Sequence, residues 1–400
     1  MRVSNNPLQQ LGALGQSIWL DYIQRDLLTG GGLRRMIAED GLRGLTSNPA
    51  IFAKAITDSR AYDADIRALA LAGNDAAAIY ETISRRDLQS AADEFRPLYD
   101  RTDGHDGYVS LEVNPRLAHD TIGTAAAARR LWSALDRPNV FIKIPATAEG
   151  LPAIRQLISE GINVNATLLF SLPRYRQVAE AYIAGIEARM AMNQPARQVA
   201  SVASFFVSRI DTLMDALLDK VIAHGGSDAG LAQKMRGQIA IASAKIAWQI
   251  HREIFGSPRF RYLAGKNIRA QRLLWASTGT KDPGYRDVKY LEALIGPGTI
   301  NTVPPETLAA YRDHGEPQVR LGRGAASARQ LLARLPELGI SIDAVTQQLE
   351  DEGIDKFIQP FDQLLAALAQ TIAARNHAAG AGTGTSFAAG AHNPQRTAAP

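Results

Sequence analysis

The stretch VFIKIPA, residues 140–146, decides how the rest of the chain is interpreted. Its β-branched and aromatic residues and its closing proline predict a short buried strand. Lys143 lies in the middle of it, although an unpaired ammonium group is costly to bury. Two interpretations are open from this strand alone. Either Lys143 lies at a strand edge and its ammonium reaches water, or it is a buried free amine that can attack a carbonyl and form a Schiff base.

The composition indicates an ordinary globular protein. The chain has 400 residues, enough for one large domain or two ordinary ones, and 46% of them are apolar. Its 44 basic residues nearly balance 40 acidic ones, for a net charge of +4. Because there is no long basic run, we expect no nucleic-acid partner. The slight positive balance suits an anionic small substrate.

Several classes of site and location are disfavoured. The chain has no cysteine, which excludes disulfides, thiolate catalysis and zinc–thiolate sites. Residues 1–16 contain no apolar run of signal-peptide length. No run of about 18 apolar residues suggests a membrane span. The simplest prediction is therefore a cytoplasmic protein without membrane contact.

Eight stretches have the composition of short strands, and helical patterns separate them. They are residues 17–21, 44–49, 108–115, 140–146, 162–170, 199–206, 272–277 and 299–305. This alternation predicts an α/β fold, a (β/α)8 TIM barrel with helical insertions. A doubly wound open sheet is the alternative, but no glycine-rich nucleotide motif follows the first strand.

The predicted barrel accounts for most of the chain. We expect a single catalytic domain over residues 1–375, with a helical insertion at about 53–101. Residues 376–400 are rich in Ala, Gly and Pro and poor in large apolar side chains. That composition predicts a disordered tail.

Polar residues recur at every second position of the predicted strands. Successive residues face opposite sides of a strand, so this set points into the barrel, toward the end where barrel enzymes place their sites. A structural hydrogen-bond network inside the barrel is the alternative. The set comprises Ser17, Trp19, Asp21, Thr46, Asn48, Ser110, Glu112, Asn114, Lys143, Asn163, Asn165, Thr167, Ser204 and Ser277.

These side chains permit a specific chemistry. A free Lys143 amine can form an imine with a ketone, and the protonated imine is an electron sink for carbon–carbon cleavage. Asp21 is the natural acid/base at the substrate hydroxyl. Glu112, through a water held by Thr167, suits proton transfer during carbinolamine dehydration. No histidine–carboxylate cluster has metal-ligand spacing, which favours the imine route over a metal-stabilised enolate.

Two cations are candidates for binding a phosphate. Arg209 follows the sixth predicted strand, where it can hold a phosphate bidentately. The alternative is a surface arginine that pairs with Asp211. Lys281 follows Ser277-Thr278-Gly279-Thr280, whose small residues let backbone N–H groups approach an anion.

With these residues in view, the chain resembles the transaldolases. The resemblance runs from about Leu14 to Thr307 and implies a lysine-dependent aldolase barrel of the cytoplasmic pentose phosphate pathway. Such an enzyme moves a dihydroxyacetone unit from sedoheptulose 7-phosphate to glyceraldehyde 3-phosphate, giving erythrose 4-phosphate and fructose 6-phosphate, without metal or cofactor. The motifs are Trp19-Leu20-Asp21, Thr46-Ser47-Asn48-Pro49, Leu111-Glu112-Val113, Ile142-Lys143-Ile144-Pro145, NVNATLLFS (163–171) and SFFVSR (204–209).

The resemblance implies a role for each matched residue. Lys143 would form the Schiff base, Asp21 would be the acid/base, and Glu112 with Thr167 would position the catalytic water. The predicted substrate contacts, with Arg209 on the phosphate and Ser204 on the dihydroxyacetone part, are Asn48, Thr46, Asn165, Ser204, Arg209, Ser277 and Lys281.

The chain also departs from the family pattern. It resembles a longer subgroup, with extra helical sequence at about 53–101. After the seventh strand many members have Ser-Phe-Arg, where this chain has Ser277-Thr278-Gly279-Thr280-Lys281, so Lys281 is the best candidate for a second phosphate ligand. A fructose 6-phosphate aldolase that releases dihydroxyacetone, and a sugar-phosphate-binding barrel without catalysis, are the alternatives. We expect a monomer or a homodimer.

Overall fold

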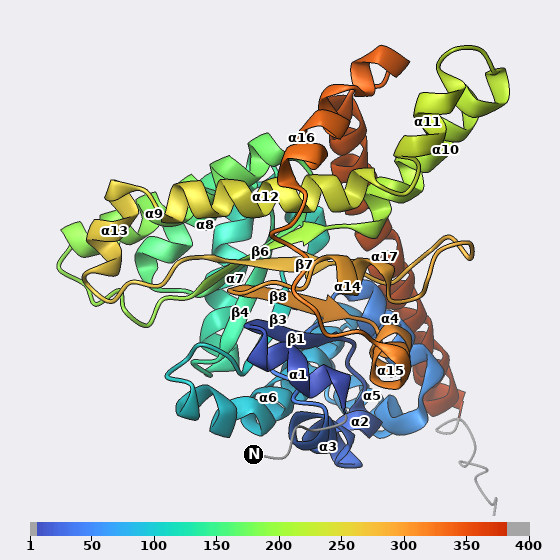
Figure 1. Ribbon diagram of the computed structural model, residues 1–400. Coiled ribbons are helices and arrows are strands. Elements are labelled where there is room, and N and C mark those ends of the chain that lie inside the picture. Colours follow the sequence, from blue (N-terminus) through green and yellow to red (C-terminus); the bar gives the residue numbers. More distant parts are fainter. Residues whose placement is uncertain (1–5, 382–400) are drawn as a thin grey trace, which may run out of the picture.

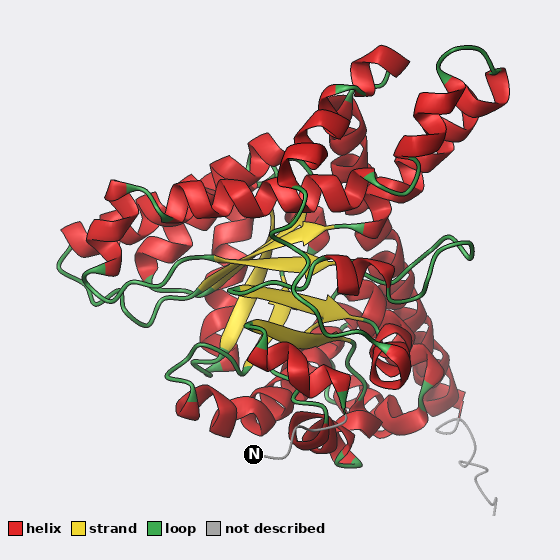
Figure 2. Ribbon diagram, in the orientation of Figure 1, coloured by secondary structure: helices red, strands yellow, loops and turns green. Residues whose placement is uncertain are grey.

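Eight parallel strands pair in sequence order and close into a barrel, with helices around it (Figures 1 and 2). The computed structural model describes residues 6–381. The closed barrel confirms the predicted (β/α)8 fold. The strands are β1 (Gln16–Asp21), β2 (Gly44–Thr46), β3 (Tyr108–Glu112), β4 (Val140–Pro145), β5 (Val164–Leu169), β6 (Ser201–Phe206), β7 (Arg272–Ala276) and β8 (Thr299–Val303).

The helices lie before, between and after these strands. None of those within residues 6–381 is long and apolar enough to cross a membrane. They are α1 (Pro7–Ala13), α2 (Arg25–Thr29), α3 (Gly32–Glu39), α4 (Pro49–Asp58), α5 (Asp63–Leu71), α6 (Ala76–Arg101), α7 (Thr121–Leu135), α8 (Gly150–Glu160), α9 (Leu172–Ala191), α10 (Ser208–His224), α11 (Ala229–Met235), α12 (Ile239–Phe255), α13 (Pro258–Ala264), α14 (Lys289–Ala293), α15 (Pro305–His314), α16 (Ala325–Ala333) and α17 (Ile342–Ala381), with the 3-10 turns η1 (Arg60–Tyr62), η2 (Pro115–Leu117) and η3 (Leu335–Leu338).

Strand pairing brings the predicted inward residues to one level of the barrel. Asp21 of β1 pairs in register with Thr46 of β2. Glu112 of β3 pairs with Lys143 of β4, and Lys143 pairs with Asn165 of β5. Because side chains of residues in register point to the same side of a parallel sheet, these groups share the barrel interior.

Aromatic side chains fill the barrel below that level. Phe141 stacks on Tyr108 with ring centroids 4.3 Å apart and on Trp19 at 6.3 Å. All three side chains are buried. The barrel floor is therefore a packed aromatic layer, as expected of barrel interiors that are filled with side chains, and the polar level lies above it.

Most predicted strands run one to three residues past the observed ones, and in two of them the overrun has the same cause. The stretches 44–49 and 108–115 end in Asn-Pro, but β2 ends at Thr46 and β3 at Glu112. Asn48 and Asn114 instead cap α4 and η2, with a proline in the first turn. An asparagine that accepts a backbone N–H, followed by proline, is a helix start. Asn114 is exposed, so its predicted place inside the barrel is wrong.

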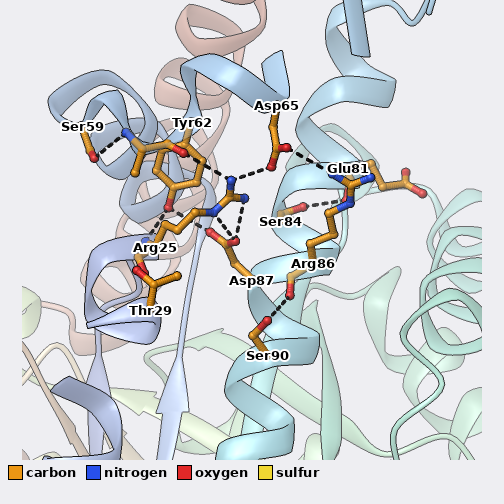
Figure 3. Close-up of polar contacts among 11 residues, drawn as sticks. Arg25, Thr29, Ser59, Tyr62, Asp65, Glu81, Ser84, Arg86, Asp87 and Ser90 are labelled. Carbon is orange, nitrogen blue, oxygen red and sulfur yellow. Dashed lines mark hydrogen bonds and ion pairs between the residues drawn. The ribbon is translucent and has the colours of Figure 1, made fainter. Parts of the chain in front are cut away.

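A partly buried ion-pair network joins the helical segment 53–101 to α2, which follows β1 (Figure 3). Arg25 of α2 donates to Asp87 of α6 at 2.8 and 3.0 Å and to Asp65 of α5 at 2.6 Å. The hydroxyl of Tyr62 donates to Asp87 at 2.9 Å, and the Arg25 guanidinium lies 4.6 Å from the Tyr62 ring centroid. These contacts fix the loop that follows Asp21.

The C-terminal helix α17 passes along the end of the barrel toward which the strands point (Figure 1). It contacts α4, η2, α10 and β5. The helix continues to Ala381, past the predicted start of the tail at residue 376. Residues 382–400 of the predicted tail lie outside the described residues.

Candidate active site

Lys143 is buried inside the barrel, with 4% of its surface exposed. Its Nζ donates to the backbone carbonyl of Ser47 at 3.1 Å and lies 3.2 Å from Oε2 of Glu112. A lysine in the fourth strand of a closed barrel has no sheet edge from which to reach water. The geometry therefore does not fit the interpretation of Lys143 as an edge residue.

A cavity of about 170 Å³ opens above Lys143 at the carboxyl ends of the strands. It brings together every predicted site residue except Glu112 and Asn165. Glu112 pairs with Lys143, and Asn165 accepts a hydrogen bond from Ser204. The lining residues are Asp21, Thr46, Asn48, Lys143, Thr167, Ser204, Phe206, Arg209, Ala276, Ser277, Gly279, Lys281, Thr302, Pro304 and Phe357.

A larger cavity, of about 340 Å³, lies at the opposite end of the barrel. Trp19, Tyr108 and Phe141 form its floor, and Arg272 at its rim is already paired with Asp106. It contains neither the buried lysine nor a free carboxylate. We therefore assign the chemistry to the smaller cavity, where barrel enzymes place their sites.

Asp21 belongs to a chain of hydrogen bonds across three strands. Thr46 Oγ1 donates to Asp21 Oδ1 at 2.6 Å and lies 2.7 Å from Thr302 Oγ1. Since Thr46 has one hydroxyl proton and gives it to Asp21, Thr302 is the donor in the second bond. Burial raises the pKa of Asp21, and the opposing effects of the Lys143 charge and the Thr46 hydrogen bond are smaller.

Glu112 is the second buried carboxylate beside Lys143. Burial raises its pKa, although the positive charge of Lys143 opposes that shift. Apart from the ion pair with Lys143, neither carboxylate oxygen accepts a hydrogen bond from the described residues. A second cavity of about 200 Å³, which Tyr80 and Arg130 also line, reaches Glu112 from outside the barrel. The carboxylate thus has unused acceptor capacity.

Thr167 and Ser204 present hydroxyl groups to the cavity above Lys143. Within residues 6–381, Thr167 Oγ1 is buried without a hydrogen-bond partner. Ser204 Oγ donates to Asn165 Oδ1 at 2.6 Å, and Asn165 Nδ2 donates to Ser110 Oγ at 3.2 Å. Thr167 is therefore free to hold a water or a substrate oxygen, whereas the amide of Asn165 is already bound.

Asn48 and Asn163, two further asparagines of the predicted inward set, differ in position. Asn48 Oδ1 accepts the backbone N–H of Ile51 at 3.0 Å, so its amide nitrogen is the group it can offer to a ligand. Asn163 lies just before β5, where its Nδ2 donates to the carbonyls of Pro138 and Val140 at 3.0 and 3.2 Å. Its predicted orientation toward the barrel mouth is wrong, because it joins backbone segments at the amino ends of the strands.

Arg209 is a cation with an unused donor. Its guanidinium carbon lies 5.4 Å from the ring centroid of Phe206 and 5.8 Å from that of Phe357. Nη1 is buried and has no hydrogen-bond partner within the described residues, and burial lowers the Arg209 pKa. Asp211, the alternative partner, instead accepts from the backbone of Ala240 at 2.7 Å. Arg209 is therefore available to an anion that enters the cavity.

Lys281 and Ser277 approach the cavity from the loop after β7. Lys281 is exposed at its rim. The next residue, Asp282, pairs with Arg236 at 2.9 Å and ties this loop to the helical layer. Ser277 has a φ of 54°, unusual for a residue with a side chain, and its Oγ lies 3.0 Å from that of Ser208. The loop thus brings a second cation to the cavity that Arg209 lines.

Six residues of the cavity lining are not among the predicted site residues, namely Phe206, Ala276, Gly279, Thr302, Pro304 and Phe357. Thr302 lies in β8, where two adjacent polar residues, Asn301 and Thr302, obscure the alternation. Phe206 lies inside the SFFVSR motif, but an aromatic residue in a strand is normally interpreted as core. Phe357 comes from α17, and no local signal separates it from the other apolar residues of that helix.

A (β/α)8 barrel with a buried lysine paired with one carboxylate, and with a second carboxylate and two cations in the same cavity, is the arrangement expected of a lysine-dependent aldolase. The chain matches the family Transaldolase/Fructose-6-phosphate aldolase over residues 18–368, and it belongs to that family. It is 48% identical to Transaldolase 2 of Nostoc sp. strain PCC 7120, with 91% of this chain and 97% of the relative covered. It is 47% identical to the transaldolase of Thermobifida fusca, with 92% and 99% covered.

Proposed function

We propose that this chain is a transaldolase of the pentose phosphate pathway. It transfers a dihydroxyacetone unit from sedoheptulose 7-phosphate to glyceraldehyde 3-phosphate and yields erythrose 4-phosphate and fructose 6-phosphate. The observation that carries this proposal is the buried Lys143, 3.2 Å from Glu112, in a cavity that it shares with Asp21. The relatives named transaldolase, which match almost the whole chain, support the same reaction.

Lys143 is the nucleophile of the proposed mechanism. Its amine adds to the donor ketone, and the carbinolamine loses water to give an iminium ion. Glu112 accepts and returns the protons of that dehydration, and Thr167 holds the water. Because burial raises the pKa of Glu112, the carboxyl can act as an acid as well as a base.

Asp21 then breaks the carbon–carbon bond. It takes the proton of the substrate hydroxyl, the aldehyde leaves, and the bonding electrons move into the iminium to form an enamine. The acceptor aldehyde enters, and the same steps run in reverse. The raised pKa of Asp21 suits a group that must accept and return one proton in each cycle. Since the iminium is the electron sink, the reaction needs no metal or organic cofactor.

The polar lining of the cavity binds the sugar. Arg209 and Lys281, which line the same cavity, bind the phosphate, and the buried Nη1 of Arg209 has no hydrogen-bond partner within residues 6–381. Asn48, Ser204 and Ser277 hold hydroxyl groups, whereas Thr46 and Asn165 act by orienting Asp21 and Ser204. We also propose a cytoplasmic monomer or homodimer, on the family resemblance alone.

A direct transfer assay tests the proposal. Purified protein receives fructose 6-phosphate with erythrose 4-phosphate, and glyceraldehyde 3-phosphate and sedoheptulose 7-phosphate are measured. We expect both products from the wild type and none from folded Lys143→Ala. Release of dihydroxyacetone without transfer would identify an aldolase instead. Turnover retained in Lys143→Ala, or sugar binding with no turnover in the wild type, would contradict the lysine mechanism.

A further inference from the structure

The helix α17 covers the barrel mouth around Lys143. It contacts α4, which follows β2, η2, which follows β3, and α10, which follows β6, as well as β5 itself. These elements surround the end of β4, and Figure 1 shows α17 crossing the carboxyl ends of the strands. A helix from the end of the chain thus forms part of the active-site wall.

The position of α17 over the mouth is fixed at several points. Asp362 pairs with Arg116 at 2.6 Å, and Glu350 pairs with Arg174 at 3.5 Å. Gly353 lies so close to β5 that a Cβ at this position would be 3.2 Å from the side chain of Leu168. The helix is therefore packed directly on the end of the strand that carries Thr167.

Phe357 is the side chain of α17 that reaches the cavity. Its ring centroid lies 5.8 Å from Nζ of Lys143 and 5.8 Å from the guanidinium carbon of Arg209. The side chain is 3% exposed. Both distances are within the range of an attractive cation–π contact. The ring can hold the two cations in place, yet it offers them neither a proton nor a hydrogen-bond acceptor.

We propose that Phe357 determines whether the three-carbon intermediate is transferred or released, by keeping bulk water from it. This inference rests on the proposed function. Release requires a proton on the enamine carbon, addition of water to the resulting iminium carbon, and cleavage of the carbon–nitrogen bond to give dihydroxyacetone and the free amine. Transfer requires the acceptor aldehyde instead. An apolar wall beside Nζ slows the first route because it limits the entry of water.

The test compares two buried apolar residues of α17. Leu364 lies two turns after Phe357, is also 3% exposed, and packs in a separate apolar cluster with Tyr62, Ile79 and Ile83. It lines neither the cavity above Lys143 nor the one that reaches Glu112. Phe357→Leu, Phe357→Ala and the control Leu364→Ala receive fructose 6-phosphate with erythrose 4-phosphate, and released dihydroxyacetone is measured against transferred product.

We expect the ratio of release to transfer to rise several-fold in Phe357→Leu and further in Phe357→Ala, with little change in Leu364→Ala. Without acceptor, the intermediate trapped by borohydride should also disappear faster in the Phe357 variants. An unchanged ratio in folded Phe357→Leu and Phe357→Ala, or an equal rise in Leu364→Ala, would overturn the inference. Absence of transfer by the wild type would instead contradict the proposed function.

Discussion

The ion pair between Arg25 and Asp87 allows a quantitative prediction about the helical segment 53–101. The side chain of Asp87 is 4% exposed and that of Arg25 16% exposed. Burial raises the Asp87 pKa despite the neighbouring guanidinium, so the charged carboxylate depends on Arg25. Removing one partner of a buried pair costs about 3–5 kcal/mol. We expect Arg25→Ala to lose that much of a total stability of about 5–15 kcal/mol.

Arg34 supplies the matched control, because it pairs with Glu94 of the same helix, α6, at 2.7 Å. The side chain of Arg34 is 75% exposed. Because exposed ion pairs contribute little to stability, we expect Arg34→Ala to unfold at nearly the same urea concentration as the wild type. Urea unfolding followed by circular dichroism measures both variants. Equal losses in the two would refute the claim that burial makes the Arg25 pair important.

Three further predictions concern the cavity. We expect Arg209→Ala to raise the KM for phosphorylated substrates by about tenfold or more, because hydrogen bonds to charged groups contribute ~1.5–3 kcal/mol. If the variant keeps the wild-type preference for phosphorylated over unphosphorylated substrates, Arg209 does not bind the phosphate. Thr46→Val removes a hydrogen bond that lowers the pKa of Asp21, so we expect that pKa to rise and the acidic limb of the kcat/KM profile to move to higher pH. An acidic limb that stays in place or moves to lower pH would argue against Asp21 as the base. Ser204→Ala leaves the buried Asn165 carbonyl without its donor and costs about 1–3 kcal/mol in urea unfolding, whereas an unaltered midpoint would mean that another donor replaces it.

The polar level of the barrel could be predicted because it depends on strand geometry alone. Alternate residues of a strand share a side, and strands in register place Asp21 beside Thr46 and Glu112 beside Lys143. The alternation does not give the direction of a side chain beyond the end of a strand. Asn114 and Asn163 keep the alternation in sequence, but one caps a helical turn and the other bonds the backbone at the opposite end of the barrel.

Asn-Pro and Ser-Pro pairs also begin other helices of the fold. Asn6 caps α1 and Ser257 caps α13, and each is followed by proline. An Asn-Pro pair that marks the end of a strand can thus also begin a helix, because the asparagine caps the first turn and the proline fits it. Phe357 could not be predicted, because its place depends on how a distant helix crosses the barrel.

Borohydride trapping tests the central claim most directly, namely that Lys143 forms an imine with the donor sugar. The protein is incubated with fructose 6-phosphate, reduced, and characterised by intact mass and peptide mapping. We predict a reduced three-carbon adduct on the peptide that contains Lys143 and none in Lys143→Ala. A protein that binds the sugar phosphate but carries no adduct, or an adduct on another lysine, would contradict the imine mechanism at Lys143.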